Sequence, residues 1–214
     1  MDDELQPVKS IAQRSPEWFA ARLGKATASR ISDIIAKTKT GWGASRANYA
    51  AELIAERLTG KNAESYINTA MQWGIDTEFQ ARIAYEAHTL ATVQEIGFIA
   101  HPRIPMSGAS PDGLVGAKGM VELKCPNTAT HIDTLLGQEI PKKYIVQMQW
   151  QMACAGRTFC DFVSFDPRMP ESMRFFRQRV DRDEDLIRSL EKDVIEFLAE
   201  IDKRVSELKG KYGI

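Results

Sequence analysis

The residues best suited to chemistry lie together in one segment, SPDGLVGAKGMVELKCP, residues 110–126. Asp112 is expected in a turn that enters a strand, and Glu122 and Lys124 lie two positions apart on the next strand, where alternate side chains share one face. Two carboxylates and one amine then meet at a solvent-facing edge. Oxygen ligands suit Mg²⁺, whose charge offsets the repulsion between the acids. The pattern predicts metal-assisted hydrolysis of a phosphodiester, with the lysine orienting or activating a water.

The same residues permit a purely structural interpretation. Asp112-Gly113 is a common β-turn pair, and the E-L-K sequence could be an exposed strand face with cross-strand ion pairs. The combination favours catalysis, because Pro111-Asp112, a short hairpin connection and then E-x-K are the arrangement of the restriction-nuclease-like PD-(D/E)xK superfamily. In either interpretation Val121 and Leu123 are expected to point into the core, since they alternate with the polar residues.

Hydrophobic periodicity and turn residues predict the elements that must position this segment. Ser15-Pro16 indicates a helix start and Gly24 a stop, and a short second helix follows from Thr27 or Ser29. Further helices are expected over residues 46–60, 69–90, 140–156 and 183–209, and strands over residues 93–101, 105–116, 119–126, 158–168 and 174–182, the first three as consecutive antiparallel strands. This order predicts a mixed α/β (α+β) fold with one central mixed sheet, flanking helices and a long C-terminal helix.

Length and composition are those of an ordinary globular protein. The 214 residues, 43% hydrophobic and 27% charged, favour one domain over residues 1–214, with residues 1–14 as an N-terminal extension. Three cysteines without a CxxC pair argue against a disulfide framework and a zinc ribbon. No signal peptide or run of about 18 apolar residues is present, so a cytoplasmic protein without a membrane anchor is expected. The formal charge of −1 neither indicates nor excludes a nucleic-acid partner, because a basic groove can be balanced elsewhere.

Beyond the acidic segment, the sequence resembles the bacteriophage lambda-type exonucleases, a group of viral recombinase or alkaline-exonuclease-like proteins within the PD-(D/E)xK superfamily. The resemblance covers about residues 15–170 in the correct order. Its blocks are W-x-x-x-R-L-G-x-x-T-A-S from Trp18 to Ser29, W-G-x-x-x-E from Trp73 to Glu78, S-P-D-G-L from Ser110 to Leu114, E-L-K-C-P from Glu122 to Pro126, Q-x-Q from Gln147 to Gln149 and D-P-R from Asp166 to Arg168.

The resemblance implies a Mg²⁺-dependent 5′-to-3′ exonuclease that degrades one strand of duplex DNA to 5′-mononucleotides and leaves a 3′ overhang. It implies that Asp112, Glu122 and the backbone carbonyl of Leu123 bind the metal, that Lys124 positions the attacking water, and that Glu78 lies near a second metal. Two Mg²⁺ ions in each active site are expected, and Mn²⁺ as a substitute. The alternative for Glu78 is that of an ordinary glutamate on the solvent-exposed face of a helix, with no role in metal binding.

A second set of residues matches the family's pocket for the terminal 5′-phosphate: Arg22, Ser29, Ser110 and Gln147. A guanidinium group forms bidentate hydrogen bonds with phosphate oxygens, and hydroxyl groups and an amide donate further hydrogen bonds. Taken singly, Arg22 could equally be a helix-surface arginine and Ser29 a helix N-cap. Lys39 matches a position where family members carry a basic residue. Met71 matches a position where they present an apolar side chain that can insert between the terminal base pairs, although a methionine more often packs in the hydrophobic core.

The resemblance also implies partners. Lambda-type exonucleases are ring-shaped homotrimers that digest processively and supply single strands to an annealing recombinase, so a homotrimer on 5′-phosphorylated duplex ends is expected, in a bacterial cell and encoded by a phage or prophage. Two other functions stay open on the sequence: a structure- or sequence-specific PD-(D/E)xK endonuclease, and a catalytically idle DNA-end-binding protein on the same fold.

Overall fold

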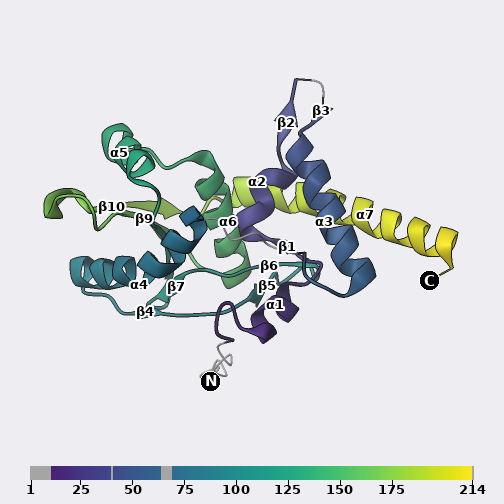
Figure 1. Ribbon diagram of the computed structural model, residues 1–214, viewed down its shortest axis with the longest axis horizontal. Coiled ribbons are helices and arrows are strands. Elements are labelled where there is room, and N and C mark those ends of the chain that lie inside the picture. The colour runs from purple at the N-terminus through teal and green to yellow at the C-terminus, as the bar shows by residue number, and fades with distance from the viewer. Residues whose placement is uncertain (1–10, 40, 64–68, 214) are drawn as a thin grey trace.

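The computed structural model describes residues 11–39, 41–63 and 69–213 (Figure 1). Its main sheet has five strands in the order β10-β9-β8-β7-β4. They are β4 (Val93–Gln94), β7 (Gly113–Val115), β8 (Gly119–Lys124), β9 (Phe159–Phe165) and β10 (Phe175–Asp181). All neighbours pair antiparallel except β8 and β9, which are parallel. The mixed α/β class and the mixed sheet are therefore confirmed.

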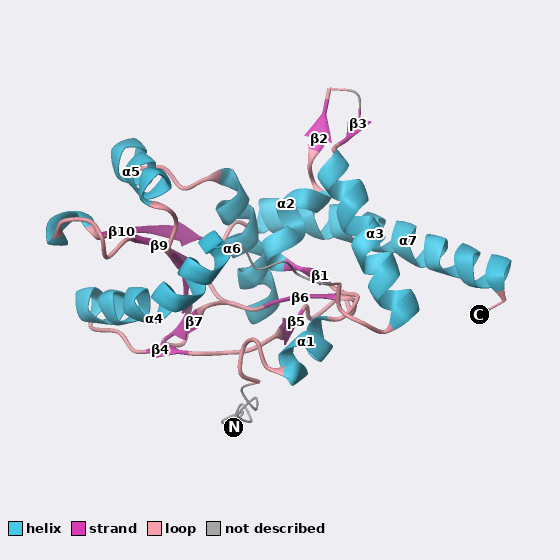
Figure 2. Ribbon diagram, in the orientation of Figure 1, coloured by secondary structure: helices cyan, strands magenta, loops and turns pink. Residues whose placement is uncertain are grey.

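Two helices cover the two faces of this sheet (Figure 2). Helix α4 (Thr69–Thr89) packs Ala81 and Tyr85 against Val121 and Leu123, so these two strand residues point into the core as expected. Helix α6 (Lys142–Ala155) packs on the opposite face, where its buried Met148 and Met152 meet residues of β8, β9 and β10. The alternating pattern of β8 therefore presents its polar residues to α6.

A second core lies on the other side of α6, where Trp150 packs against the N-terminal and C-terminal helices. The helices of this core are α2 (Ile31–Ile34), α3 (Ala44–Thr59) and the long helix α7 (Glu184–Tyr212), which extends beyond the body next to α3 in Figure 1. Helix α1 (Pro16–Arg22) precedes them and has no buried residue. Ser15 caps α1 by accepting a hydrogen bond from the Trp18 N–H at 3.2 Å, and Gly60 ends α3 in the left-handed conformation. These ends agree with the sequence, as does the long C-terminal helix.

The expected short second helix from Thr27 or Ser29 is confirmed, whereas the assignment of residues 93–101 and 105–116 to two long consecutive strands was wrong and one helix was missed. Strands β5 (Ile99–Ala100) and β6 (Ser107–Ala109) leave the main sheet and form a three-stranded sheet with β1 (Ala26–Thr27), which pairs parallel to β6. The short second helix consequently starts after β1, as a 3-10 turn at Ala28–Arg30 that leads into α2. Helix α5 (Thr128–Gly137) was not expected, although Asn127 caps it by accepting from the Thr130 N–H at 2.9 Å.

The remaining described strands, β2 (Lys37–Thr38) and β3 (Gly41–Trp42), form a hairpin that projects from the body above α3 (Figure 1). No helix within the described ranges combines the length and the apolar character needed to cross a membrane.

Candidate active site

The hairpin of β7 and β8 places Asp112 beside the middle of β8. Gly113 pairs antiparallel with Val121, so Asp112, the residue before β7, falls opposite Glu122. Its Oδ2 atom accepts a hydrogen bond from the N–H of the next residue, Leu123, at 2.7 Å. Only glycine fits after the acid, because a Cβ atom at position 113 would lie 2.1 Å from Cγ1 of Val93. Glycine at this position is therefore favoured by close packing, since Gly113 is already part of β7 and the turn of the hairpin follows at residues 116–118.

Glu122 is completely buried, which corrects the expectation that it faces solvent. Its Oε1 atom forms an ion pair with Lys124 and accepts a hydrogen bond from Nε2 of Gln147 at 2.5 Å. Its Oε2 atom accepts from Nε2 of Gln151 at 2.7 Å. The reason for the difference is α6, which covers this face of β8 and places Gln147 and Gln151, one turn apart, over the carboxylate. Such donors offset the cost of burying a charge.

The electrostatics of the site reflect crowded carboxylates. Burial and the neighbouring charge of Glu122 hold the pKa of Asp112 well above its ordinary value, with a further contribution from Glu78 and an opposing one from Lys124. Burial by itself would lower the pKa of Lys124, but the charges of Glu122 and Asp112 outweigh it and raise that pKa, so Lys124 is an ammonium ion.

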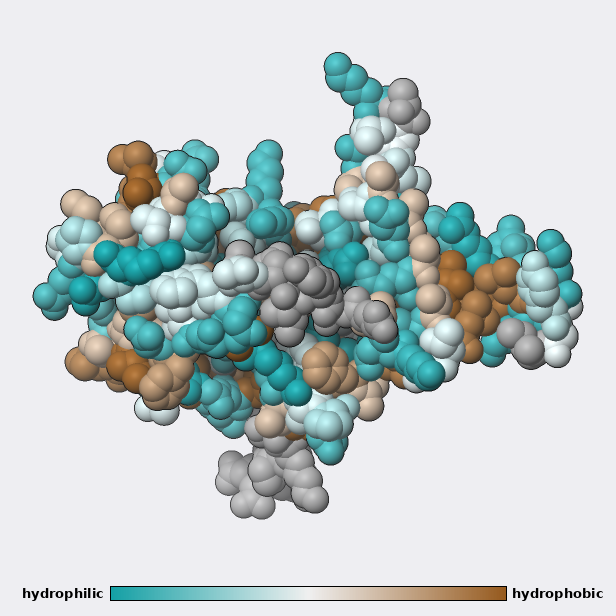
Figure 3. Space-filling view, viewed as in Figure 1, coloured by the Kyte–Doolittle hydropathy of each residue, from teal (hydrophilic) through white to brown (hydrophobic). Residues whose placement is uncertain are grey.

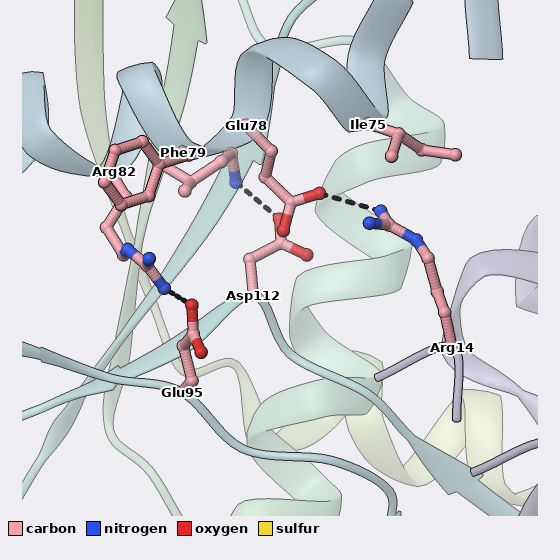
Figure 4. A pocket seen from close by; sticks show the side chains of 8 residues that line it. Arg14, Ile75, Glu78, Phe79, Arg82, Glu95 and Asp112 are labelled. Atoms are coloured by element: carbon pink, nitrogen blue, oxygen red, sulfur yellow. Dashed lines mark hydrogen bonds and ion pairs between the residues drawn. The ribbon is translucent and has the colours of Figure 1, made fainter. Parts of the chain in front are cut away.

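Glu78 reaches the same place from α4. Together with Asp112 and Leu123 it lines a cavity of about 240 Å³ at the end of the sheet (Figure 4). Nη2 of Arg14 lies 3.1 Å from Oε2 of Glu78, and Figure 4 shows this guanidinium beside the two carboxylates. The structure thus brings Asp112, Glu122, Lys124 and Glu78 together, three of them from the β7–β8 hairpin and one from α4.

The donor set suits a hard divalent cation. Asp112 and Glu78 offer carboxylate oxygens to one cavity. Burial first, and the charges of Glu122 and Glu78 second, raise the pKa of Asp112, and a bound cation would offset both effects. Among the described residues, no three histidine, cysteine or acidic side chains are grouped closely enough to hold a metal ion alone. Mg²⁺ does not need such a group, because it keeps several waters and binds one or two carboxylates together with substrate phosphates.

Beside this site lies a cavity of about 330 Å³ whose lining includes Arg22, Ser29 and Met71, with Lys25 and Arg30 as further cations. Ser110 lies under it, accepting hydrogen bonds from Nη1 of Arg22 at 3.1 Å and from Trp18 Nε1 at 2.9 Å. Burial lowers the pKa of Arg22 from its ordinary value.

The two sites adjoin each other. Ser29 and Met71 also line a cavity of about 520 Å³ whose lining includes Asp112 and Lys124. Arg22, Ser29, Ser110 and Met71 are thus brought together next to the acidic residues.

Two other candidates lie elsewhere. Gln147 donates its amide to Glu122, and therefore belongs to the carboxylate site. Lys39 is exposed at the turn of the β2–β3 hairpin and lines none of these cavities.

The sequence interpretation missed three residues that the structure adds to the site. Gln151 follows Gln147 by four positions, a spacing that could have indicated a shared helix face. Tyr144 lines the 520 Å³ cavity, and its ring centroid lies 5.2 Å from Nζ of Lys124. Arg14 stands in the segment that the sequence assigned to an N-terminal extension, and no sequence pattern pointed to it.

Comparisons with known proteins identify the family and the fold. The family model of the YqaJ-like viral recombinase domain matches residues 17–158. The crystal structure of the alkaline exonuclease LHK-Exo from Laribacter hongkongensis is 51% identical with a TM-score of 0.88, and the match covers 93% of this chain and 98% of that chain. The crystal structure of LHK-Exo in complex with dAMP matches with the same values.

A phage-related exonuclease from Haemophilus somnus 129PT shares the fold, with 21% identity, a TM-score of 0.72 and coverage of 86% of this chain and 96% of that chain. The comparison with curated proteins gave no significant match. The family model spans well over half of the chain, and the similarity to LHK-Exo extends over nearly all of it. The chain therefore belongs to the family of YqaJ-like viral recombinase domains.

Proposed function

We propose that this protein is a Mg²⁺-dependent 5′-to-3′ exonuclease that degrades one strand of double-stranded DNA from its end. The observation that carries the proposal is the meeting of Asp112, Glu122 and Lys124 at the end of the mixed sheet, directly beside the cationic cavity that contains Arg22. The proposal takes this sheet with its carboxylates as the core of a PD-(D/E)xK nuclease. The similarity to an alkaline exonuclease over almost the whole chain supports the same activity.

The residues divide the reaction between them. Asp112, the Leu123 carbonyl and Glu78, which line the same cavity, would hold Mg²⁺, or Mn²⁺ in its place, with two ions per site. Glu122, proposed as a further ligand, would join them by exchanging one of its contacts with Lys124, Gln147 or Gln151 for the cation. The bound cation supplies positive charge to the phosphate as negative charge builds up on it. Lys124, fixed by Glu122, orients a water toward phosphorus. The bond from phosphorus to the 3′ oxygen breaks, so the terminal nucleotide leaves as a 5′-mononucleotide and the next one keeps its 5′-phosphate.

Direction of digestion follows from the second cavity. Arg22 and Ser29 would bind the terminal 5′-phosphate, with Ser110 holding the guanidinium of Arg22 in place. Met71 lies between this cavity and the carboxylates and would contact the terminal base pair. Each cleavage creates a new 5′-phosphate for the same pocket. LHK-Exo in complex with dAMP is consistent with a mononucleotide product.

The wider setting is recombination. A family of viral recombinase domains fits an enzyme that prepares 3′ overhangs for a single-strand annealing protein in a bacterial cell, encoded by a phage or prophage. We include in the proposal a single domain and a homotrimeric ring, which would make digestion processive by enclosing the strand that remains.

The deciding experiment is digestion of a linear duplex labelled distinguishably at its 5′ and 3′ ends, in Mg²⁺ and in EDTA, with a covalently closed circle alongside. Mg²⁺-dependent release of mononucleotides from the 5′ end, with the circle intact, is expected. Cut circles would indicate an endonuclease, and end binding without cutting would indicate an idle end-binding protein. A duplex with 5′-hydroxyl ends should be digested more slowly than one with 5′-phosphates, and equal rates would remove the phosphate pocket from the proposal.

A further inference from the structure

The residues before α1 form a strap, Ile11–Ser15, that is fixed against the catalytic hairpin. Nε2 of Gln13 donates to the Pro111 carbonyl at 2.8 Å and to the Ile96 carbonyl at 3.0 Å. Position 97 must be glycine, because a Cβ atom there would lie 2.1 Å from the Ile11 carbonyl oxygen. The strap is thus anchored at the residue next to Asp112, as part of the wall of the active site.

Arg14 is held in this strap in an unusual backbone conformation. Its φ angle is +67°, in the left-handed region that side-chain-bearing residues seldom adopt. Residues kept in such conformations by their surroundings cluster at functional sites. An exposed ion pair contributes little to stability, so the contact with Glu78 does not by itself account for the conformation.

The guanidinium of Arg14 has unused hydrogen-bonding capacity toward the catalytic cavity. Nη2 donates to Oε2 of Glu78 at 3.1 Å, and this is its one hydrogen bond among the described residues. Its side chain is 45% exposed and lines the 240 Å³ and the 520 Å³ cavities beside Asp112. Among the described residues that line the larger cavity, the other cation is Lys124, which is occupied by Glu122.

We propose that Arg14 contacts the substrate, binding a backbone phosphate of the DNA in the catalytic cavity while Glu78 orients its guanidinium. Arginine is always charged and presents five N–H donors, so it can pair with one carboxylate and still bind phosphate oxygens. The inference rests on the proposed function, since it names a further contact of the same site with DNA. In a competing role, Arg14 would act as a stand-in cation: it would neutralise the charge of Glu78 until a divalent ion binds, and it would make no contact with DNA.

The test measures the binding of 5′-phosphorylated duplex in Ca²⁺ over a range of salt concentrations, for wild type, Arg14→Asn and Arg14→Lys. Asparagine adopts the left-handed conformation readily and removes the charge, whereas lysine keeps the charge. A phosphate contact adds about 0.9 to the slope of log affinity against log salt. Arg14→Asn is expected to lose about that amount and to lower kcat/KM about tenfold or more, while Arg14→Lys keeps the slope. Arg188→Asn, a charge change at an exposed pair on α7, should alter neither quantity.

Two results would overturn the inference. One is a wild-type slope and wild-type kcat/KM in Arg14→Asn. The other is an unchanged salt dependence of DNA binding in Arg14→Asn together with tighter Mn²⁺ binding by the same variant, measured by titration calorimetry. That result would mean that Arg14 only neutralises Glu78 in place of a metal ion. A failure of the proposed function is distinguishable, because the wild-type protein itself would then neither bind duplex ends in Ca²⁺ nor digest them in Mg²⁺.

Discussion

At the scale of single residues, Glu122 shows how a charge is kept in the core beside a reactive centre. Lys124 and Gln147 satisfy one of its oxygens, and Gln151 satisfies the other. The amide donors stabilise the carboxylate without adding charge. The formal charges of Asp112, Glu122 and Glu78 against those of Lys124 and Arg14 therefore leave one negative charge at the site. A site of this kind attracts a cation and still keeps its glutamate in one rotamer.

Lys124→Ala is expected to lower the rate of hydrolysis by about 10²-fold or more, because the group that orients the water is removed. DNA binding in Ca²⁺ should change little, since Gln147 and Gln151 still hold Glu122 and no proposed metal ligand is lost. The measurement is single-turnover digestion together with a binding titration. Turnover at the wild-type rate would refute the role given to Lys124.

Gln151→Leu should lower the free energy of unfolding by about 1–3 kcal/mol, because Oε2 of Glu122 loses its buried donor. The Oε1 atom of Gln151 has no hydrogen-bond partner among the described residues, so the side chain serves Glu122 alone. In a Glu122→Gln background the same change should cost less, since a neutral amide needs the donor less. Chemical denaturation of the four proteins measures this coupling, and equal costs in both backgrounds would contradict it.

The types and order of Asp112, Glu122 and Lys124 could be predicted because they lie within one hairpin, where register follows from alternation. The burial of Glu122 could not, because it depends on α6, which starts at Lys142 and packs across the sheet. Arg14 lies much further from Glu78 in the sequence, and only the tertiary fold brings the two together.

At the scale of elements, the long helices α3, α6 and α7 could be predicted because each has a clear apolar stripe or a clear end signal. Helix α4 was also predicted, although its apolar residues are not concentrated on one face. The two-residue strands β1 and β5 could not. They are too short to show periodicity, and their partner β6 pairs with β1 across a long stretch of chain. Helix α5 was missed because its cap at Asn127 follows the catalytic strand within a few residues, where the sequence still suggests strand and turn.

His101, the residue directly after β5, contacts both α6 and α7. Its ring stacks on Trp150 of α6 with centroids 4.8 Å apart, its Nδ1 accepts from the Arg103 N–H at 3.2 Å, and its Nε2 lies 3.2 Å from Glu191 of α7. Burial lowers the pKa of His101; Glu191 opposes this shift, and Arg103 and Arg182 add to it.

The folded protein therefore keeps His101 neutral where the unfolded chain, with a pKa of about 6.5, takes up a proton. Its contribution to stability is present above that pH and is lost as the pH falls below it. We expect the free energy of unfolding to fall between pH 7 and pH 5, and His101→Asn, which retains an acceptor for Arg103, to weaken that dependence. Denaturation at several pH values measures it, with the exposed His88→Asn as the control. An equal slope in His101→Asn and wild type would argue against this role.

At the scale of the whole molecule, the described residues expose apolar side chains on several elements. Phe79 and Ile83 lie exposed on α4 and Leu90 directly after it, Ile132 and Leu136 lie exposed on α5, and Figure 3 shows apolar residues along the C-terminal half of α7. Exposed apolar surface of this kind is typical of contacts between proteins. It is compatible with the proposed ring, in which subunits cover part of each other.

Sedimentation equilibrium is expected to give a mass of three chains of 24.0 kDa each. Digestion of a long duplex should continue after an excess of unlabelled DNA ends is added as a trap, because an enclosed strand cannot escape. A monomer whose digestion stops at the trap would exclude the ring while leaving the exonuclease chemistry intact.

The parallel pairing of β8 with β9 sets the order in which the proposed site can be assembled during synthesis. β8 ends at Lys124, but β9 begins at Phe159, and Gln147 and Gln151 lie on the crossover between them. Pairings between distant parts of a chain form slowly, because the connecting segment must first be closed into a loop. A chain that ends before β9 therefore contains every residue proposed for the site but lacks the strand that pairs with the second edge of β8.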